Sequence, residues 1–165
     1  AQYIASCDWL TGLGSRLWVE SQIQQRIDRS SAFCAIIVDI DEFKRVNDDH
    51  GHLVGDELLK QFAGELRSAC RSNDIVGRWG GDEFIALLDC RLDEANAQTE
   101  RLRKWVCGNY TVQGKSGPQK VRVDAALGLA EHAEGETLKE LLDRADAGMY
   151  QNKAATHANG GGVRG

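Results

Sequence analysis

The chain contains, near its middle, the stretch Arg78-Trp79-Gly80-Gly81-Asp82-Glu83-Phe84, in which two adjacent acids follow two glycines. Extended, strand-forming sequence lies on both sides, in Asp74–Gly77 and Phe84–Leu88, so we predict a β-hairpin with the acids at its tip. Glycines at such a tip let a ligand approach the backbone. Neighbouring carboxylates repel each other unless a cation or a donor-rich ligand neutralises them. A solvated Asp-Glu turn without function is the alternative interpretation of this stretch alone.

A second acidic cluster follows a predicted buried strand. Ala35–Val38 is a continuous apolar run, and it ends in Asp39-Ile40-Asp41-Glu42. If both strands belong to one sheet, Asp39 and Asp82 can approach a shared hard cation with oxygen ligands, for which Mg²⁺ is the first candidate. The five cysteines show no paired spacing and no zinc-type arrangement with the four histidines, so we interpret each as a small buried apolar residue.

The remaining pattern predicts alternating helices and strands in one domain, which suits a length of 165 residues. Either Thr11 or Ser15 is expected to cap the first helix. Residues 158–165 are expected to form a flexible C-terminal tail. The predicted elements are helices at 17–27, from Asp41 or Asn47 to 66, at 93–106 and at 138–150, and a strand at 121–129.

Composition excludes some classes of partner. The net charge is −5 and the acids are dispersed, which argues against a nucleic-acid partner, because such proteins gather Lys and Arg on one face. No apolar stretch approaches the length of a membrane span, and Ala1–Cys7 lacks the features of a secretory signal. We therefore expect a cytoplasmic segment without membrane contact. Since it lacks an initiating Met, we also expect it to follow a sensor or membrane region of a longer protein.

Several separated motifs in order resemble the GGDEF domain family, the diguanylate cyclases. The resemblance covers residues 1–157 and implies an α+β fold, with a central, mainly antiparallel sheet wrapped by helices, related to nucleotidyl cyclases and polymerase palm domains. Besides the hairpin, the matching stretches are Asp8-Trp9-Leu10-Thr11-Gly12-Leu13, Asp39-Ile40-Asp41-Glu42-Phe43-Lys44-Arg45-Val46-Asn47-Asp48, Gly51-His52, Gly55-Asp56-Glu57, Arg144-Ala145-Asp146-Ala147-Gly148-Met149-Tyr150 and Lys153.

The resemblance implies that two GTP molecules condense to cyclic di-GMP and two pyrophosphates, by metal-assisted attack of a 3′-hydroxyl on an α-phosphate across a homodimer. It places Asp39, the backbone carbonyl of Ile40, Asp82 and Glu83 on Mg²⁺, or on Mn²⁺. It also makes Asp82 or Glu83 the group that helps to activate the hydroxyl, and the choice of base stays open. Lys44 is expected to stabilise the transferring phosphoryl group, and a solvated surface lysine is the alternative.

The substrate site implied by the resemblance uses four further positions. Asn47 and Asp56 are expected to read guanine, because a carboxylate accepts from the N1–H and N2–H donors that adenine does not present together. His52 is expected to contact the nucleotide, with a structural turn residue as the alternative. Lys153 is expected to hold the triphosphate. The sequence departs from the family pattern at His157, where an arginine is expected, and this departure concerns GTP affinity.

Just before the hairpin, Arg71-Ser72-Asn73-Asp74 matches the Arg-x-x-Asp inhibitory site of the family. Arg71 is expected to grip a phosphate or guanine edge of the product, and Asp74 to accept guanine N–H donors. Arg101 or Arg103 is a candidate for a second cation. The alternatives to an enzyme are a domain that binds GTP or cyclic di-GMP without turnover, and a structural dimerisation module.

Overall fold

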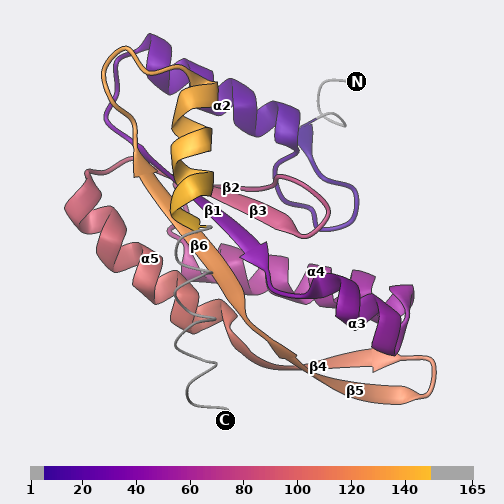
Figure 1. Cartoon of the computed structure of the whole chain (residues 1–165). Helices are drawn as coiled ribbons and strands as arrows, with labels where there is room; N and C mark the ends of the chain where they lie inside the picture. The colour runs from indigo at the N-terminus through magenta and orange to yellow at the C-terminus, as the bar shows by residue number, and fades with distance from the viewer. Residues whose placement is uncertain (1–5, 150–165) are drawn as a thin grey trace.

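The computed structural model describes residues 6–149, and its centre is a four-stranded sheet (Figure 1). The strands are β1 (Cys34–Ile40), β2 (Ile75–Arg78), β3 (Glu83–Leu88) and β6 (Ala125–Glu131), in the spatial order β2-β3-β1-β6. Each neighbouring pair is antiparallel. The predicted hairpin is the β2–β3 pair, and β1 lies beside β3. The predicted α+β fold is confirmed, and the two acidic strand ends belong to adjacent strands.

Helices cover both faces of this sheet, because successive side chains of a strand point to opposite sides. Ile36 and Val38 face α4 and α5, whereas Ala35 and Ile37 face α2 and the last helix. Among residues 6–149, none of the helices combines the length and the apolar character needed to cross a bilayer. The covering helices are α2 (Arg16–Asp28), α4 (His52–Ala69), α5 (Leu92–Val106) and a helix over 138–149.

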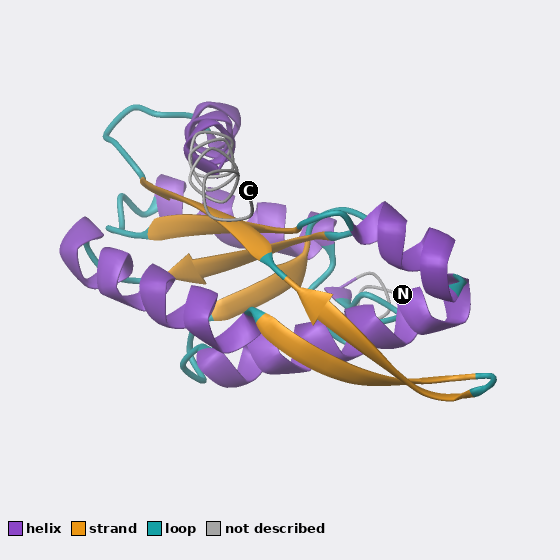
Figure 2. Ribbon diagram, turned by 60° about the horizontal axis from the view of Figure 1, so that its bottom comes forward, coloured by secondary structure: helices purple, strands orange, loops and turns teal. Residues whose placement is uncertain are grey.

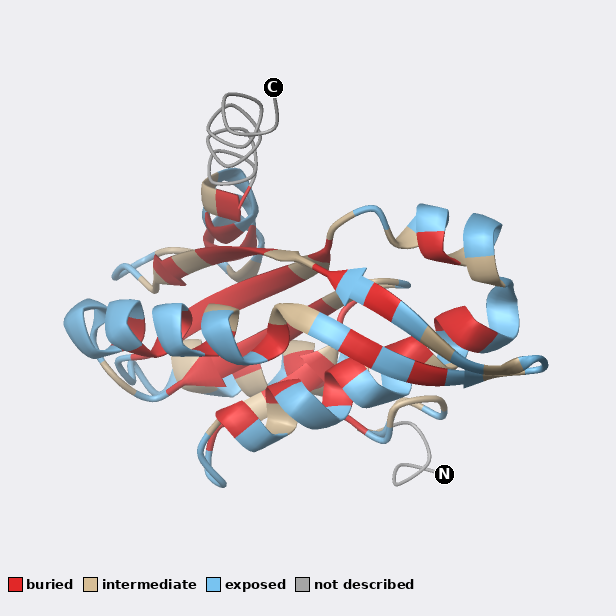
Figure 3. Cartoon of the chain, turned by 90° about the horizontal axis from the view of Figure 1, so that it is seen from below, coloured by how far each residue is buried: buried red, intermediate tan, exposed pale blue. Residues whose placement is uncertain are grey.

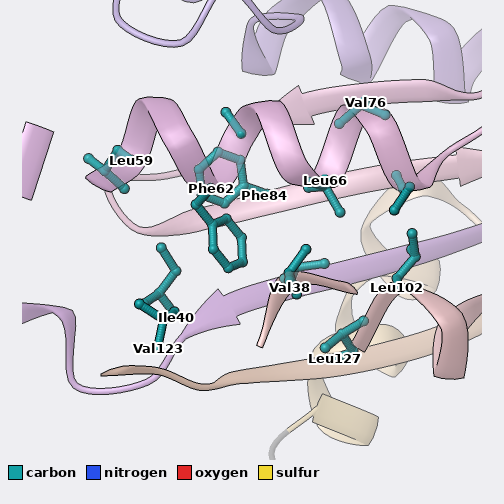
Figure 4. Packing of buried hydrophobic residues seen from close by; sticks show 14 of the residues in the cluster. Val38, Ile40, Leu59, Phe62, Leu66, Val76, Phe84, Leu102, Val123 and Leu127 are labelled. Atoms are coloured by element: carbon teal, nitrogen blue, oxygen red, sulfur yellow. The ribbon is translucent and has the colours of Figure 1, made fainter. Parts of the chain in front are cut away.

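The larger core lies between the sheet and the helices α4 and α5. Phe62 of α4 packs on Phe84 of β3, with ring centroids 5.3 Å apart (Figure 4). The hydroxyl of Tyr110 donates a hydrogen bond of 2.7 Å to the carbonyl of Val106, which satisfies this buried group. Figure 3 shows buried residues running through the strands, with exposed residues on the outer helix surfaces. Burying one large apolar side chain contributes about 1.5–3 kcal/mol, so this core holds the strand register that aligns the acids.

A second, two-stranded sheet extends away from the main sheet (Figure 2). It pairs β4 (Gly108–Gly114) with β5 (Gly117–Val123). The single strand predicted at 121–129 was wrong, because β5 ends before Asp124 and β6 begins after it in the other sheet. The carbonyl of Asp124 accepts a hydrogen bond of 2.8 Å from the Asp41 N–H, which ties this junction to the loop after β1. Strand β4 was not predicted, since its apolar alternation is limited to two buried residues.

The predicted helical region after β1 consists of two helices, α3 (Phe43–His50) and α4. They separate at Gly51, whose φ of 89° and ψ of 164° suit glycine and interrupt the helical path. The Gly51 N–H still donates to the carbonyl of Asn47, at 2.8 Å. The bend places the end of α3, with Asn47, next to the start of α4, with Asp56.

Candidate active site and regulatory turn

The carboxylates at the two strand ends meet through the register of β1 and β3. Asp39 lies directly opposite Glu83 in the ladder. The Ile40 N–H donates a hydrogen bond of 3.2 Å to the backbone carbonyl of Asp82, so the hairpin tip is tied to the end of β1. Glu83 thus follows Asp82 in the chain and lies opposite Asp39 across the ladder, so it is the central member of the acidic group.

The charges of the neighbouring carboxylates change the pKa of Glu83. The pKa of Glu83 is raised, first by partial burial and then by the negative charges of Asp39, Asp82 and Asp146, while Arg16 acts in the opposite direction. Among residues 6–149, no three Asp, Glu, His or Cys side chains form a ready-made metal cage. A divalent cation that is bound by one or two carboxylates together with waters and substrate phosphates needs no such cage. Asp39, Asp82 and Glu83, with the Ile40 carbonyl, are the groups available to hold it.

Backbone and side-chain donors fix the shape of the hairpin tip. The N–H groups of Trp79 and Gly80 donate to the carbonyl of Glu83, at 2.8 and 3.1 Å. The Arg78 guanidinium donates to the carbonyls of Gly80 and Gly81, at 3.2 and 2.9 Å. A Cβ on Gly81 would meet nothing within 4 Å, so the outer side of the tip is open to a ligand. The turn is therefore rigid on its inner side and accessible on its outer side.

Sequence reasoning missed the role of Asp8 in supporting this tip. The Asp8 carboxylate lies 3.4 Å from the Arg78 guanidinium and accepts hydrogen bonds from the backbone and hydroxyl of Thr11, at 2.8 and 2.7 Å. Burial alone would raise the pKa of Asp8, but the bonds from Thr11 and the charge of Arg78 outweigh it and lower the pKa. Thr11 is thus occupied with Asp8, and Ser15 caps α2 by accepting the Trp18 N–H at 3.2 Å. The Asp-x-x-Thr spacing was the available signal for this turn.

Arg16 is a second residue that sequence reasoning missed. Its guanidinium lies 4.4 Å from the ring centroid of Trp79, in a cation–π contact, and its charge lowers the pKa of Glu83 against the raising effect of the other acids. The side chain is 58% exposed and also pairs with Glu20 at 3.2 Å. No sequence signal reveals this contact, because the fold brings the first turn of α2 onto a hairpin far along the chain.

The loop after β1 leads directly into the N-terminus of α3. Glu42 has the left-handed conformation with φ 54° and ψ 36°, and its side chain does not cap the first turn. Backbone N–H groups at such a helix start attract anions. Lys44 is exposed in this first turn, whereas Arg45 pairs with Glu42 at 3.4 Å and with Asp49 at 3.7 Å.

The predicted base-reading residues lie on the two sides of the α3–α4 bend. A Cβ at Gly55 would overlap the side-chain oxygen of Asn47, so the Asn47 amide lies directly against the backbone of α4. Asp56, next to Gly55, is exposed, and so is His52 at the start of α4. The fold therefore brings Asn47 to the first turns of α4, which carry Asp56. Lys153 and His157 lie outside the described residues, as does the predicted tail.

The turn Arg71-Ser72-Asn73-Asp74 immediately precedes β2 and is held by several bonds. The buried Asp74 carboxylate accepts the Arg71 N–H at 2.8 Å, and the Asp74 N–H donates to the carbonyl of Arg71 at 3.0 Å. Arg67 donates to the carbonyls of both Arg71 and Asp74. The Arg71 guanidinium pairs with Glu94 of α5 at 2.8 Å. The fold brings Arg71 and Asp74 together, but both already have partners in the protein.

Comparison with known proteins shows the family of this chain. Residues 5–159 match the family model described as diguanylate cyclase, GGDEF domain. The chain is 38% identical to the response regulator PleD of Caulobacter vibrioides over 159 residues, which are 92% of this chain and 35% of PleD. It is 34% identical to the diguanylate cyclase DgcS of Shewanella oneidensis, over 92% of this chain and 50% of DgcS. The chain thus spans half or less of the length of these two relatives.

A solved structure shows the same fold. The diguanylate cyclase SiaD of Pseudomonas aeruginosa, in complex with its activator SiaC, aligns with a TM-score of 0.84 and 33% identity, over 93% of this chain and 61% of that chain. The family match and the sequence relatives show the family, and the solved structure shows the same fold. This chain is a member of the diguanylate cyclase GGDEF domain family.

Proposed function

We propose that this domain is a diguanylate cyclase, which joins two GTP molecules into cyclic di-GMP and releases two pyrophosphates. The observation that carries the proposal is the meeting of Asp39, Asp82 and Glu83 at adjacent strand ends, where their charges act on one another. A fold gains nothing from such repulsion unless a cation or a cationic ligand arrives. Phosphoryl transfer requires a site of this kind, since it depends mainly on positioning and on charge stabilisation.

The chain's own groups divide the work of the reaction. Asp39, Asp82, Glu83 and the Ile40 carbonyl hold Mg²⁺, or Mn²⁺, which when bound offsets the charge on the phosphoryl oxygens. Asp82 or Glu83 takes the proton of the attacking 3′-hydroxyl. The open side of Gly81 leaves room for the reacting phosphate next to these acids. Lys44 adds a full positive charge at the start of α3, where the transferring phosphoryl group lies.

Recognition of GTP follows from the α3–α4 bend. The Asn47 amide and the Asp56 carboxylate read the guanine edge, and His52 contacts the nucleotide at the start of α4. Lys153 holds the triphosphate. We expect Gly55→Ala to weaken GTP binding, because the added Cβ overlaps the side-chain oxygen of Asn47 and must displace that amide. Gly64→Ala on the same helix is the matched control, since a Cβ there meets nothing within 4 Å.

A single domain binds a single GTP in this proposal, so catalysis needs two copies facing each other. Proximity of the two bound nucleotides then supplies a large part of the rate acceleration. We infer that the preceding region of the full-length protein senses a signal and controls this encounter. We further infer that the domain works in the cytoplasm, where GTP is available.

The turn before β2 is proposed to bind the product and inhibit the enzyme. Arg71 grips a phosphate or guanine edge, and Asp74 accepts guanine N–H groups. Arg101 is the better candidate for the second cation, because it lies near the same thiol as Asp74. The charge of Asp74 raises the pKa of Cys70, and the charge of Arg101 lowers it. Arg103 instead pairs with Glu100 at 3.6 Å, and its charge acts on Cys107 at the other end of the helix.

The test is incubation of concentrated protein with GTP and Mg²⁺, followed by separation of the nucleotides. We expect cyclic di-GMP and pyrophosphate, formed at a specific rate that rises with protein concentration. Asp82→Ala should abolish this turnover. Asp28→Ala is the matched control, since that exposed acid at the end of α2 accepts a hydrogen bond from Gln24 of its own helix. Unchanged turnover by Asp82→Ala would reject the mechanism, and tight product binding without any turnover would identify a receptor instead.

A further inference from the structure

The turn Arg71–Asp74 lies against the first turn of α5, and little space remains between them. The cavity there has a volume of about 30 Å³, room for one or two water molecules. It is bordered by Arg71, Asp74, Asp89 and Glu94, among others. A guanine nucleotide cannot enter a space of this size. A ligand that approaches Arg71 from this side must therefore displace a side chain that now borders the cavity, whereas the other side of the turn, at Asp74, borders a separate cavity of about 410 Å³.

Glu94 is the acid that occupies the Arg71 guanidinium. Its Oε1 lies 2.8 Å from Nη1 of Arg71, which is both a hydrogen bond and an ion pair. Both side chains are more than half exposed, at 61% for Arg71 and 51% for Glu94, so they can separate without disturbing the core. An exposed ion pair of this type is weak enough for a phosphate to replace it.

The other acids at the cavity are engaged elsewhere. Both carboxylate oxygens of Asp89 accept from the Arg26 guanidinium, at 2.7 and 3.1 Å. Asp74 already accepts the Arg71 N–H and closes the turn. The backbone of the turn is in addition fixed by Arg67, which donates to two of its carbonyls. The turn is thus preformed, and its Arg71 side chain is the part that has to change partner.

We propose that Glu94 sets the product affinity of the inhibitory site, by holding Arg71 in an internal ion pair that cyclic di-GMP must displace. This inference rests on the proposed product-inhibition function. The product phosphate takes the place of the Glu94 carboxylate on the guanidinium fork, and Glu94 turns into solvent. The consequence is that inhibition begins at a higher product concentration than the turn alone would set.

Isothermal titration of cyclic di-GMP into the purified protein tests this directly. Glu94→Gln should bind the product about two- to fivefold more tightly than the unmodified protein, which is the range expected for an exposed ion pair. The matched control is Asp93→Asn, which removes the same charge from the same first turn of α5. Equal affinities of the two variants, or weaker binding by Glu94→Gln, would overturn the proposal.

A double-mutant cycle separates displacement from a general charge effect. In an Arg71→Ala background, Glu94→Gln should no longer change product affinity, because Glu94 then has no guanidinium to hold. A persistent gain in that background would show that Glu94 only repels the product phosphate. Raised salt should also narrow the difference between the unmodified protein and Glu94→Gln.

The titration also tests the inhibitory site separately from the role of Glu94. If the unmodified protein binds cyclic di-GMP and Arg71→Ala binds it measurably but more weakly, the inhibitory site is supported whatever Glu94 does. If neither the unmodified protein nor Glu94→Gln binds the product, the inhibitory site is wrong and the role of Glu94 falls with it. Turnover of GTP, measured separately, tests the cyclase activity independently of both.

Discussion

The two ends of the short strand β2 carry charge in opposite ways. At its start, the turn Arg71–Asp74 pairs its charges within the protein: Arg71 with Glu94, and Asp74 with a backbone N–H. At its end, the hairpin partly buries Glu83 and brings it close to Asp39 and Asp82, and both effects raise the pKa of Glu83. The turn is stabilised by its own partners, whereas the hairpin tip holds like charges close together.

This difference separates two kinds of ligand site. Where charges are already paired, a ligand must compete with an internal partner, and its affinity is lowered by the strength of that pair. Where like charges are brought together, a cationic ligand relieves a cost that folding has imposed, and its binding is favoured. In the function that we propose, the first arrangement belongs to the inhibitory product site and the second to the metal site.

The largest expected effect is on catalysis. Asp39→Asn should lower turnover of GTP by about a thousandfold, because it removes one of the oxygen ligands offered to the cation while keeping the side-chain shape. Its thermal stability without metal should not fall, since the substitution also removes a repulsive charge. Cyclic di-GMP formation and the melting temperature are the measurements. Near-normal turnover would contradict the assignment of Asp39 to the metal site, and a clear loss of stability would show that its charge contributes to the fold.

The opposite behaviour is expected at the other end of β2. Asp74→Ala should lower the free energy of unfolding by about 1–3 kcal/mol, because the Arg71 N–H loses its acceptor next to a buried position. Urea unfolding measures this, with Asn73→Ala, an exposed neighbour in the same turn, as the control. A stability equal to that of the control would show that the turn does not depend on the Asp74 carboxylate.

The smallest expected effect concerns the pH dependence of stability. The folded-state pKa of Glu83 lies above its ordinary value of 4.5, so the folded protein binds more protons than the unfolded chain between these two values. The contribution of Glu83 to the free energy of unfolding of the metal-free protein should therefore fall as the pH rises through 4.5 and above. Glu83→Gln should remove this part of the slope, and Mg²⁺ should reduce it in the unmodified protein.

Chemical denaturation at a series of pH values, with and without Mg²⁺, gives the comparison. Glu57→Gln is a suitable control, because that partly exposed acid lies on α4 and pairs with the nearby Lys60, at 2.9 Å. If Glu83→Gln and Glu57→Gln showed the same slope above pH 4.5, the repulsion at the hairpin tip would have no measurable cost.

Much of the fold followed from local sequence. The hairpin at 74–88, the buried strand ending at Asp39 and the helices α2 and α5 were predicted, because neighbouring residues alone carry turn signals and apolar periodicity. Strand β4 and the break at Asp124 were not predicted. Their short alternating segments acquire a structure mainly from pairing with each other and from the link to Asp41.

The sequence by itself placed acids at two strand ends, because the order of apolar and polar residues determines where a strand stops. Only the tertiary structure decided that Glu83, rather than Asp82, lies opposite Asp39, since a one-residue change of register would reverse which side chains share a face. The same holds for Arg16 over Trp79 and for Glu94 on Arg71. These contacts join residues from separate elements, and packing of the whole domain is what brings them within bonding distance.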